Sequence, residues 1–211
     1  MEFKLPTETI ELPSKGLLYP EGHPLSGGTV EMKYMTAKEE DILTNTNYIK
    51  NGTVIDKLLQ SLLVTKFDYN DIIVGDKNAI MVAARILSYG KDYEFEYNGE
   101  DHVADLSLLE HRELNVENYT KGVNEFTFTL PTTGNVVTFK VLSHGDERKI
   151  EQEVKGLKKI NKDNLTESTT RLKHIITSVN GSSEAKDIRE FVDNYLLAKD
   201  ARALREEYSR V

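Results

Sequence analysis

Residues that interrupt regular secondary structure are concentrated in the first 35 positions of this chain of 211 residues. Four of its five prolines lie there, together with several glycines. Proline lacks a backbone N–H and glycine has no strong backbone preference, so neither favours a long helix or a central strand. We therefore expect residues 1–35 to form an irregular arm that contains short strands near residues 8–12 and 29–34.

The composition is that of a folded protein without cysteine. Hydrophobic residues make up 38% of the chain and charged residues 29%, which is unlike the composition of disordered proteins. The absence of cysteine excludes disulfide frameworks, thiolate metal sites and cysteine nucleophiles. A chain of this length buries about 70% of its unfolded surface, enough for one large domain or two small ones.

The sequence gives no indication of export, membrane insertion or nucleic-acid binding. The first six residues, MEFKLP, contain no apolar signal core. The longest apolar runs are far shorter than the roughly 20 residues that a membrane helix needs. Residues 1–140 carry 13 basic and 22 acidic groups, a balance that disfavours contact with nucleic-acid phosphates. We therefore expect a soluble protein in the cytoplasm of the cell that makes it.

A helical pattern begins immediately after the arm. Thr36 and Glu39 have the spacing of a capping box, in which the glutamate side chain reaches back to the first residue of the box. We expect a second helix after Gly52, and a third that Asp76 caps and Gly90 ends. The first helix is predicted to place four residues on one face, namely Ile42, Leu43, Thr46 and Ile49.

The hydrophobic period changes from helical to two at Asp92. Aromatic residues then alternate with acidic ones, which is the pattern of a half-buried strand. A turn at residues 98–101 leads toward a second strand at 103–106. The aromatic positions of this pattern are Tyr93, Phe95 and Tyr97.

A second hairpin is predicted at residues 126–142, with its turn at 131–135. We expect its two strands to join the preceding pair in one small antiparallel sheet. From Ser143 onward the pattern is helical, and four helices are expected. The second of these should continue through Val179 to a stop at Asn180, and the last should begin after Asp200.

These patterns together predict an α+β fold that is mainly helical, with a small antiparallel sheet of about four strands and an irregular N-terminal arm. Three segments are expected along the chain. They are the arm at residues 1–35, helices with antiparallel hairpins at 36–142, and a C-terminal helical portion at 143–211.

No established catalytic or metal-binding motif occurs in the chain. Glu31 and Lys33 supply half of a metal-dependent nuclease site, which also needs a further carboxylate. The acidic residues at 92–101 offer oxygen ligands for a divalent cation, although their alternation is more typical of a solvated sheet face. A metal-dependent hydrolase or nuclease is therefore the alternative to a protein without enzymatic activity, and we predict no metal or cofactor.

The arm contains apolar side chains in a segment with little prospect of regular structure. Such side chains either fold back on the core of their own chain or dock on another chain, and the sequence leaves both alternatives open. If they dock, a protein that lacks residues 1–28 should fold but no longer bind its partner. The candidate partner-binding residues are Lys15, Leu17, Leu18 and Tyr19 in the arm, with Leu204 and Tyr208 on the amphipathic C-terminal helices.

Four blocks of sequence, taken in order, resemble the baseplate hub assembly proteins of T-even-like contractile-tailed phages. The blocks are LPSKGLLYP at 12–20, MTAKEEDILTN at 35–45, NGTVIDKLL at 51–59, and GDKNAI at 75–80 continuing to RILSYG at 85–90. The resemblance is densest over residues 12–97 and continues more loosely to residues 178–181 and 200–205. It lies in the order and spacing of the blocks.

The resemblance implies a non-enzymatic protein that is required to build the central hub of the tail baseplate. Its partners would be other baseplate hub or tail proteins, with self-association left open. It would be located in the host cytoplasm during assembly, and also in the virion if it is retained. The family includes hub subunits as well as transient chaperones, and the sequence does not separate these two roles.

The chain departs from this family at one feature. Many relatives carry cysteine pairs that resemble zinc-binding knuckles, either after the strand that matches residues 93–97 or in a C-terminal extension. This chain has Asn98-Gly99-Glu100-Asp101 at the first place and ends at Val211 before the second. We therefore expect no metal-stabilised element.

Overall fold

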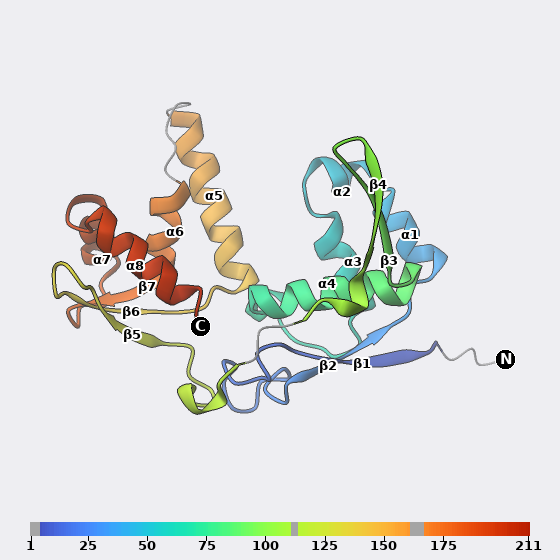
Figure 1. Cartoon of the computed structure of the whole chain (residues 1–211), viewed down its shortest axis with the longest axis horizontal. Helices are drawn as coiled ribbons and strands as arrows, with labels where there is room; N and C mark the ends of the chain where they lie inside the picture. Colours follow the sequence, from blue (N-terminus) through green and yellow to red (C-terminus); the bar gives the residue numbers. More distant parts are fainter. Residues whose placement is uncertain (1–4, 111–113, 161–166) are drawn as a thin grey trace. The chain divides into compact units, whose positions relative to one another are not determined.

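The structure, a computed structural model, describes residues 5–110, 114–160 and 167–211. The chain divides into two compact units: unit 1 comprises residues 1–68 and 75–123, and unit 2 comprises residues 69–74 and 124–211. Within the described ranges, the fold combines eight α-helices with three antiparallel sheets of two, two and three strands (Figure 1). The predicted segment 36–142 therefore contributes to both units.

The N-terminal arm of unit 1 forms a two-stranded sheet and a tightly turned loop. Strand β1 (Thr7–Glu11) pairs antiparallel with β2 (Thr29–Lys33), which confirms the two short strands. In the loop between them, Gly16 has a φ of +73°, and a Cβ there would lie 2.5 Å from the carbonyl oxygen of Ser26. Only glycine fits this close approach of two backbone segments.

The arm loop folds back onto the core of unit 1. Helix α4 (Val74–Tyr89) begins two residues before Asp76, so the predicted capping role of Asp76 is wrong. Its buried carboxylate instead accepts hydrogen bonds from the Ser14 backbone N–H at 2.9 Å, the Ser14 hydroxyl at 2.6 Å and the Tyr19 hydroxyl at 2.7 Å. The apolar side chains of the arm loop that are buried in this core are Leu12, Leu18, Tyr19 and Leu25.

Three short helices follow the arm: α1 (Ala37–Leu43), α2 (Thr46–Lys50) and α3 (Val54–Leu62). The single helix predicted over α1 and α2 is wrong, because the Asn45 side chain accepts from the backbone N–H groups of the next turn and starts a new helix. The helix after Gly52 is confirmed. Helix α4 also ends at Tyr89 as predicted, with Gly90 in the left-handed conformation.

The capping box at the start of α1 is confirmed and has a further function in the core. Glu39 is fully buried, and its carboxylate accepts from the Thr36 backbone N–H at 3.0 Å. It also accepts from Lys33 and from the Ser61 hydroxyl, each at 2.8 Å. Burial alone would raise the pKa of Glu39, but these hydrogen bonds outweigh it and lower the pKa to about 2.

A separate hairpin completes unit 1. Strand β3 (Asp92–Tyr97) pairs with β4 (Glu100–Asp105) across a two-residue turn, in which Asn98 and Gly99 have φ angles of 54° and 81°. Two successive residues with positive φ suit the right-handed twist of the flanking strands. No third strand joins this ladder within the described residues, so the prediction of one four-stranded sheet is wrong.

The sheet of unit 2 contains a strand that the sequence pattern did not predict. The hairpin of β5 (Phe126–Thr129) and β6 (Val136–Phe139) is confirmed, and β7 (Ile176–Val179) pairs with β6. Helix α6 (Glu167–Ile175) stops before β7, which corrects the helix predicted through Val179. Ile176, Thr177 and Val179 are β-branched, and such residues favour a strand wherever a partner edge is present.

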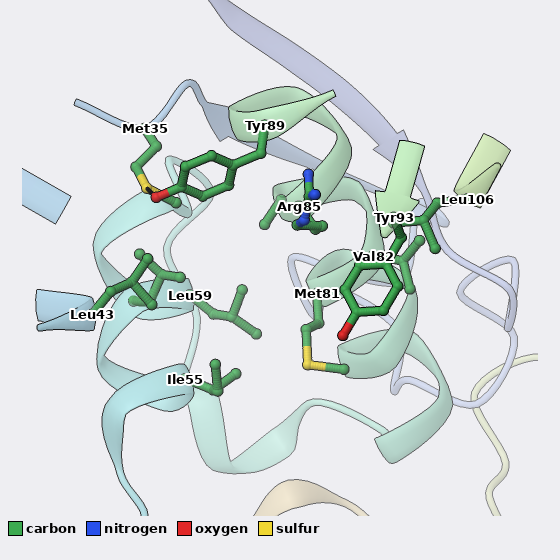
Figure 2. A pocket seen from close by; sticks show the side chains of 12 residues that line it. Met35, Leu43, Ile55, Leu59, Met81, Val82, Arg85, Tyr89, Tyr93 and Leu106 are labelled. Carbon is green, nitrogen blue, oxygen red and sulfur yellow. Dashed lines mark hydrogen bonds between the residues drawn. The ribbon is translucent and has the colours of Figure 1, made fainter. Parts of the chain in front are cut away.

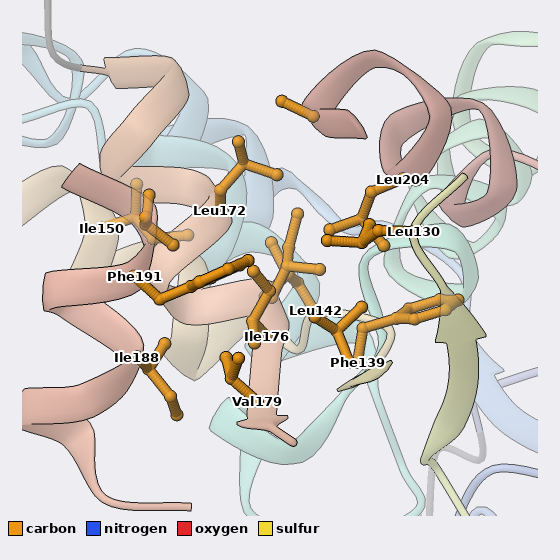
Figure 3. Packing of buried hydrophobic residues seen from close by; sticks show 14 of the residues in the cluster. Leu130, Phe139, Leu142, Ile150, Leu172, Ile176, Val179, Ile188, Phe191 and Leu204 are labelled. Carbon is orange, nitrogen blue, oxygen red and sulfur yellow. The ribbon is translucent and has the colours of Figure 1, made fainter. Parts of the chain in front are cut away.

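Four helices pack in unit 2: α6, α5 (His144–Ile160), α7 (Ala185–Asn194) and α8 (Ala198–Tyr208). Their apolar faces and the inner face of the sheet form one contiguous core, in which Phe139 is 1% exposed (Figure 3). The other residues labelled there are Leu130, Leu142, Ile150, Leu172, Ile176, Val179, Ile188, Phe191 and Leu204.

An aspartate in the first turn of α8 holds the turn of the β5–β6 hairpin. Helix α8 starts at Ala198, before the predicted position, and places Asp200 in its first turn. The Asp200 carboxylate accepts from the backbone N–H groups of Thr132 at 2.8 Å and Thr133 at 3.1 Å. Burial would raise the pKa of Asp200, but these hydrogen bonds lower it. Among the described residues, no helix has both the length and the apolar character needed to cross a membrane.

Candidate protein-binding surface

An uncovered row of aromatic side chains occupies one face of the β3–β4 hairpin. Tyr93, Phe95 and Tyr97 alternate along β3, and the cross-strand partner of Phe95 is His102. The ring centroid of Phe95 lies 6.1 Å from that of Tyr93 and 5.6 Å from that of His102. Phe95 is nevertheless 41% exposed and Tyr97 63% exposed, so the prediction of a half-buried strand is wrong. We call these four side chains the aromatic row.

The opposite face of the hairpin is acidic. Residues 92–105 contain six Asp or Glu residues and no Lys or Arg. The acidic side chains on the face away from the aromatic row surround Val103, which is 65% exposed. Unit 1 as a whole contains 12 Lys and Arg residues against 20 Asp and Glu residues, a formal charge of −8, whereas unit 2 contains 15 of each. The negative charge of the chain is therefore carried by the unit with the aromatic row.

The base of the hairpin is anchored to the end of α4. Lys91 donates to Asp105 at 2.6 Å, which lowers the pKa of Asp105 to about 2 and raises the pKa of Lys91. The Arg85 guanidinium donates to the carbonyl oxygens of Gly90 at 2.9 Å and Asp92 at 3.2 Å. A two-stranded hairpin by itself is only marginally stable in water. Anchoring fixes its base, while the aromatic row continues toward the turn without a covering layer.

An apolar pocket of about 430 Å³ lies inside unit 1 beside this base. Figure 2 shows Leu43, Ile55 and Leu59 on one side, with Met81 of α4 facing them and Tyr93 beside it. Its volume is in the range of pockets that hold small ligands. Because Tyr93 belongs to both, the pocket and the aromatic row form one continuous surface. The remaining lining residues are Met35, Leu58, Val82, Ala84, Arg85, Tyr89 and Leu106.

Of the described side chains that line this pocket, Arg85 alone carries a charge. Its guanidinium carbon lies 5.3 Å from the ring centroid of Tyr89 and 5.8 Å from that of Tyr93. Arg85 therefore makes cation–π contacts with two aromatic rings of the pocket lining while it donates to two backbone carbonyls. The Tyr89 hydroxyl in turn approaches the Met35 sulfur at 3.7 Å. The pocket wall is therefore held in place by contacts within unit 1.

The structure places the predicted partner-binding residues of the arm in different environments. Lys15 is exposed and Leu17 is half-buried. Leu18 and Tyr19 are buried, and Tyr19 is also tied to Asp76. Of the two alternatives for the arm, the structure shows the first: it folds back on the core of its own chain. Leu18 and Tyr19 are therefore core residues and do not offer a docking surface.

The predicted partner-binding residues of α8 also face inward. Leu204 is fully buried in the core of unit 2. Tyr208 is half-buried, with its ring centroid 6.2 Å from that of Phe139. Its hydroxyl oxygen accepts from the Leu142 backbone N–H at 3.2 Å. Both side chains therefore complete the packing of unit 2.

The residues considered for metal chemistry are engaged elsewhere or dispersed. Glu31 accepts from the Thr7 hydroxyl at 2.7 Å, and Lys33 forms its ion pair with Glu39. Across the residues that the structure describes, no three His, Cys, Asp or Glu side chains come together in a group that could hold a metal ion.

The pocket could not be predicted from the sequence, because its walls come from separate segments of unit 1. Leu43, Ile55, Met81 and Leu106 each belong to a different element or connection. Their apolar character is that of ordinary core residues. The alternation of aromatic and acidic residues at 92–97 was the one local sign of an unusual surface. No family model, curated protein or solved structure matches the chain.

Proposed function

We propose that the protein is a non-enzymatic component of phage tail assembly that binds other baseplate hub or tail proteins. Two independent features support this proposal. One is the ordered series of sequence blocks that resembles baseplate hub assembly proteins. The other, which carries the structural argument, is the uncovered aromatic row that runs into an apolar pocket. Exposed apolar surfaces of this kind mark sites of protein association, and aromatic side chains are enriched at such interfaces.

The mechanism would be burial of the aromatic row against a partner subunit. Phe95 and Tyr97 would lose their remaining contact with water, and this burial would supply most of the affinity. The acidic face of the hairpin would guide the encounter, because long-range charge changes association rates more than it changes final affinity. Among the arm residues, the exposed Lys15 remains a candidate contact.

Co-purification with individual hub proteins of the same phage tests this proposal. The double variant Phe95→Ser/Tyr97→Ser removes exposed apolar surface and should lose the complex that the unaltered protein forms. The matched control is Tyr195→Ser in unit 2, where the tyrosine is 60% exposed. If the double variant binds as the unaltered protein does, or if no hub or tail protein binds at all, the proposal fails.

The same proposal includes two fates for the protein, retention as a hub subunit and departure as a chaperone. Mass spectrometry of purified particles and of baseplate intermediates distinguishes them. A retained subunit is present in both samples, whereas a transient chaperone is found in the intermediates alone. Calorimetric titration with Mg²⁺ and Mn²⁺ addresses the alternative of a metal-dependent hydrolase, which would require specific binding of one of these ions.

A further inference from the structure

The shape and charge of unit 1 restrict what can occupy its apolar pocket. We propose that the occupant is a basic amphipathic helix of a partner protein, with apolar side chains inserted into the pocket and Lys or Arg residues on both flanks of this apolar face. This inference rests on the proposed function, because it specifies the chemistry of the segment that the partner contributes.

The walls of the pocket favour a helix as the inserted element. Side chains of α1, α3 and α4 form its sides, and Tyr93 and Leu106 close it at the hairpin (Figure 2). Apolar grooves lined by helices accept the apolar face of an amphipathic helix, which inserts residues three or four positions apart. The aromatic row extends this surface beyond the pocket, so one helix face could contact both.

The charge around the pocket favours a basic partner segment. Unit 1 has a formal charge of −8. On the face of the aromatic row, Glu100 is the cross-strand partner of Tyr97. Lys and Arg residues that flank the apolar face of a partner helix would approach this surface with attractive charge. Two copies of this surface would repel each other, so the same charges disfavour a second copy of the chain as occupant.

The charges also disfavour an anionic small molecule such as a fatty acid. Arg85 is the cation of the pocket lining, and its guanidinium already donates to two backbone carbonyls and lies over two tyrosine rings. A carboxylate would compete with these contacts and would also add negative charge to a unit with a formal charge of −8. A helix with an apolar face and basic flanks would make apolar contacts with the pocket and leave the contacts of Arg85 in place.

Binding of three model peptides to the full chain tests the inference. The probe is a labelled 18-residue Leu/Lys peptide with the leucines on one helical face. One comparison peptide replaces every Lys with Glu, and another carries two central prolines that prevent a helix. In fluorescence anisotropy at low salt, the Leu/Lys peptide should bind at least about tenfold more tightly than either comparison peptide. Its affinity should fall on addition of 0.5 M NaCl because salt screens the attraction.

Two pocket variants make the test specific to this site. Ile55→Trp fills the pocket from a side chain that is 36% exposed, and Met81→Lys places a charge in it from one that is 39% exposed. Each should reduce binding of the Leu/Lys peptide at least about tenfold. The matched control, Leu197→Trp in unit 2, alters another exposed aliphatic side chain and should leave binding unchanged.

The outcomes separate this inference from the proposed function. If the Leu/Glu peptide or the proline peptide binds as well, or if both pocket variants leave binding unchanged, the inference is overturned. The proposed function still stands in that case if a hub protein co-purifies with the chain and is lost on Phe95→Ser/Tyr97→Ser. If light scattering shows a dimer that Ile55→Trp dissociates, the occupant is a second copy and the inference is overturned.

Discussion

In both units a buried aspartate accepts hydrogen bonds from an irregular connection, but the two units differ in how their strands are covered. In unit 1 the buried Asp76 holds the arm, and in unit 2 the buried Asp200 holds the β5–β6 turn. The sheet of unit 2 packs one face against helices around Phe139. The hairpin of unit 1 leaves Phe95 and its neighbours in contact with solvent. The sheet of unit 2 is therefore covered by helices of its own unit, whereas the aromatic face of the unit 1 hairpin remains uncovered.

Deletion of residues 1–28 should have the largest effect on this comparison. The deletion removes β1 and the four buried apolar side chains of the arm loop, so unit 1 should unfold while unit 2 keeps its structure. NMR spectra of the truncated protein should retain dispersed methyl signals from the unit 2 core and lose those of unit 1. A truncated protein with unit 1 intact would show that the arm is not part of its core.

Truncation of one phenylalanine in each unit should separate stability from binding. Phe139→Ala in the core of unit 2 should lower the free energy of unfolding by about 4 kcal/mol. Phe95→Ala in the aromatic row should cost less than about 1 kcal/mol, because the side chain is already 41% exposed. Urea unfolding monitored by circular dichroism measures both. A similar loss in the two variants would mean that the hairpin is covered in solution.

Removal of Asp76 should test whether the arm depends on one carboxylate. Asp76→Ala leaves the Ser14 and Tyr19 donors buried without their acceptor, which should destabilise unit 1 by about 3 kcal/mol. Limited proteolysis should then cleave within the arm. Asp187→Ala is the matched control, because Asp187 is also in the first turn of a helix but is exposed. Equal effects of the two substitutions would contradict the assigned role of Asp76.

Lowering the pH should gradually reduce the stability of both units, because one glutamate in each becomes protonated. The pKa of Glu39 in unit 1 is lowered from 4.5 to about 2 by hydrogen bonds that outweigh its burial. Hydrogen bonds from Arg189, together with His174, lower the pKa of Glu153 in unit 2 to about 2. A lowered folded-state pKa stabilises the protein above the unfolded value, and this contribution is lost as the pH falls toward 2.

Substitution by glutamine should therefore remove a specific part of the acid sensitivity. Glu39→Gln should reduce the stability of unit 1 at neutral pH and flatten its pH dependence between about pH 4.5 and 2. Glu153→Gln should do the same for unit 2 alone. NMR-detected urea unfolding at pH 7, 4 and 2.5 measures the two units separately. An unchanged pH profile in either variant would mean that another carboxylate dominates that unit.

Features that depend on neighbouring residues were predictable from the sequence. The capping box of Thr36 and Glu39 and the turn at Asn98-Gly99 both involve residues within a few positions of each other. The pairings of β3 with β4 and of β5 with β6 follow from alternation and short turns between the strands. These elements form because local hydrogen bonds and backbone preferences already favour them.

Features that depend on distant contacts were decided by the tertiary structure. Asp76 has the sequence context of a helix cap, yet its partners lie 57 and 62 positions away in the arm. The segment 176–179 continues a helical pattern in the sequence, but it forms strand β7 because it pairs with the edge of β6. The apolar pocket exists because separate helices and the base of the hairpin converge. The capping box, the Asn98-Gly99 turn and the acidic character of unit 1 can be read from the sequence. Which apolar side chains remain uncovered follows only from the fold, because burial depends on contacts between distant segments.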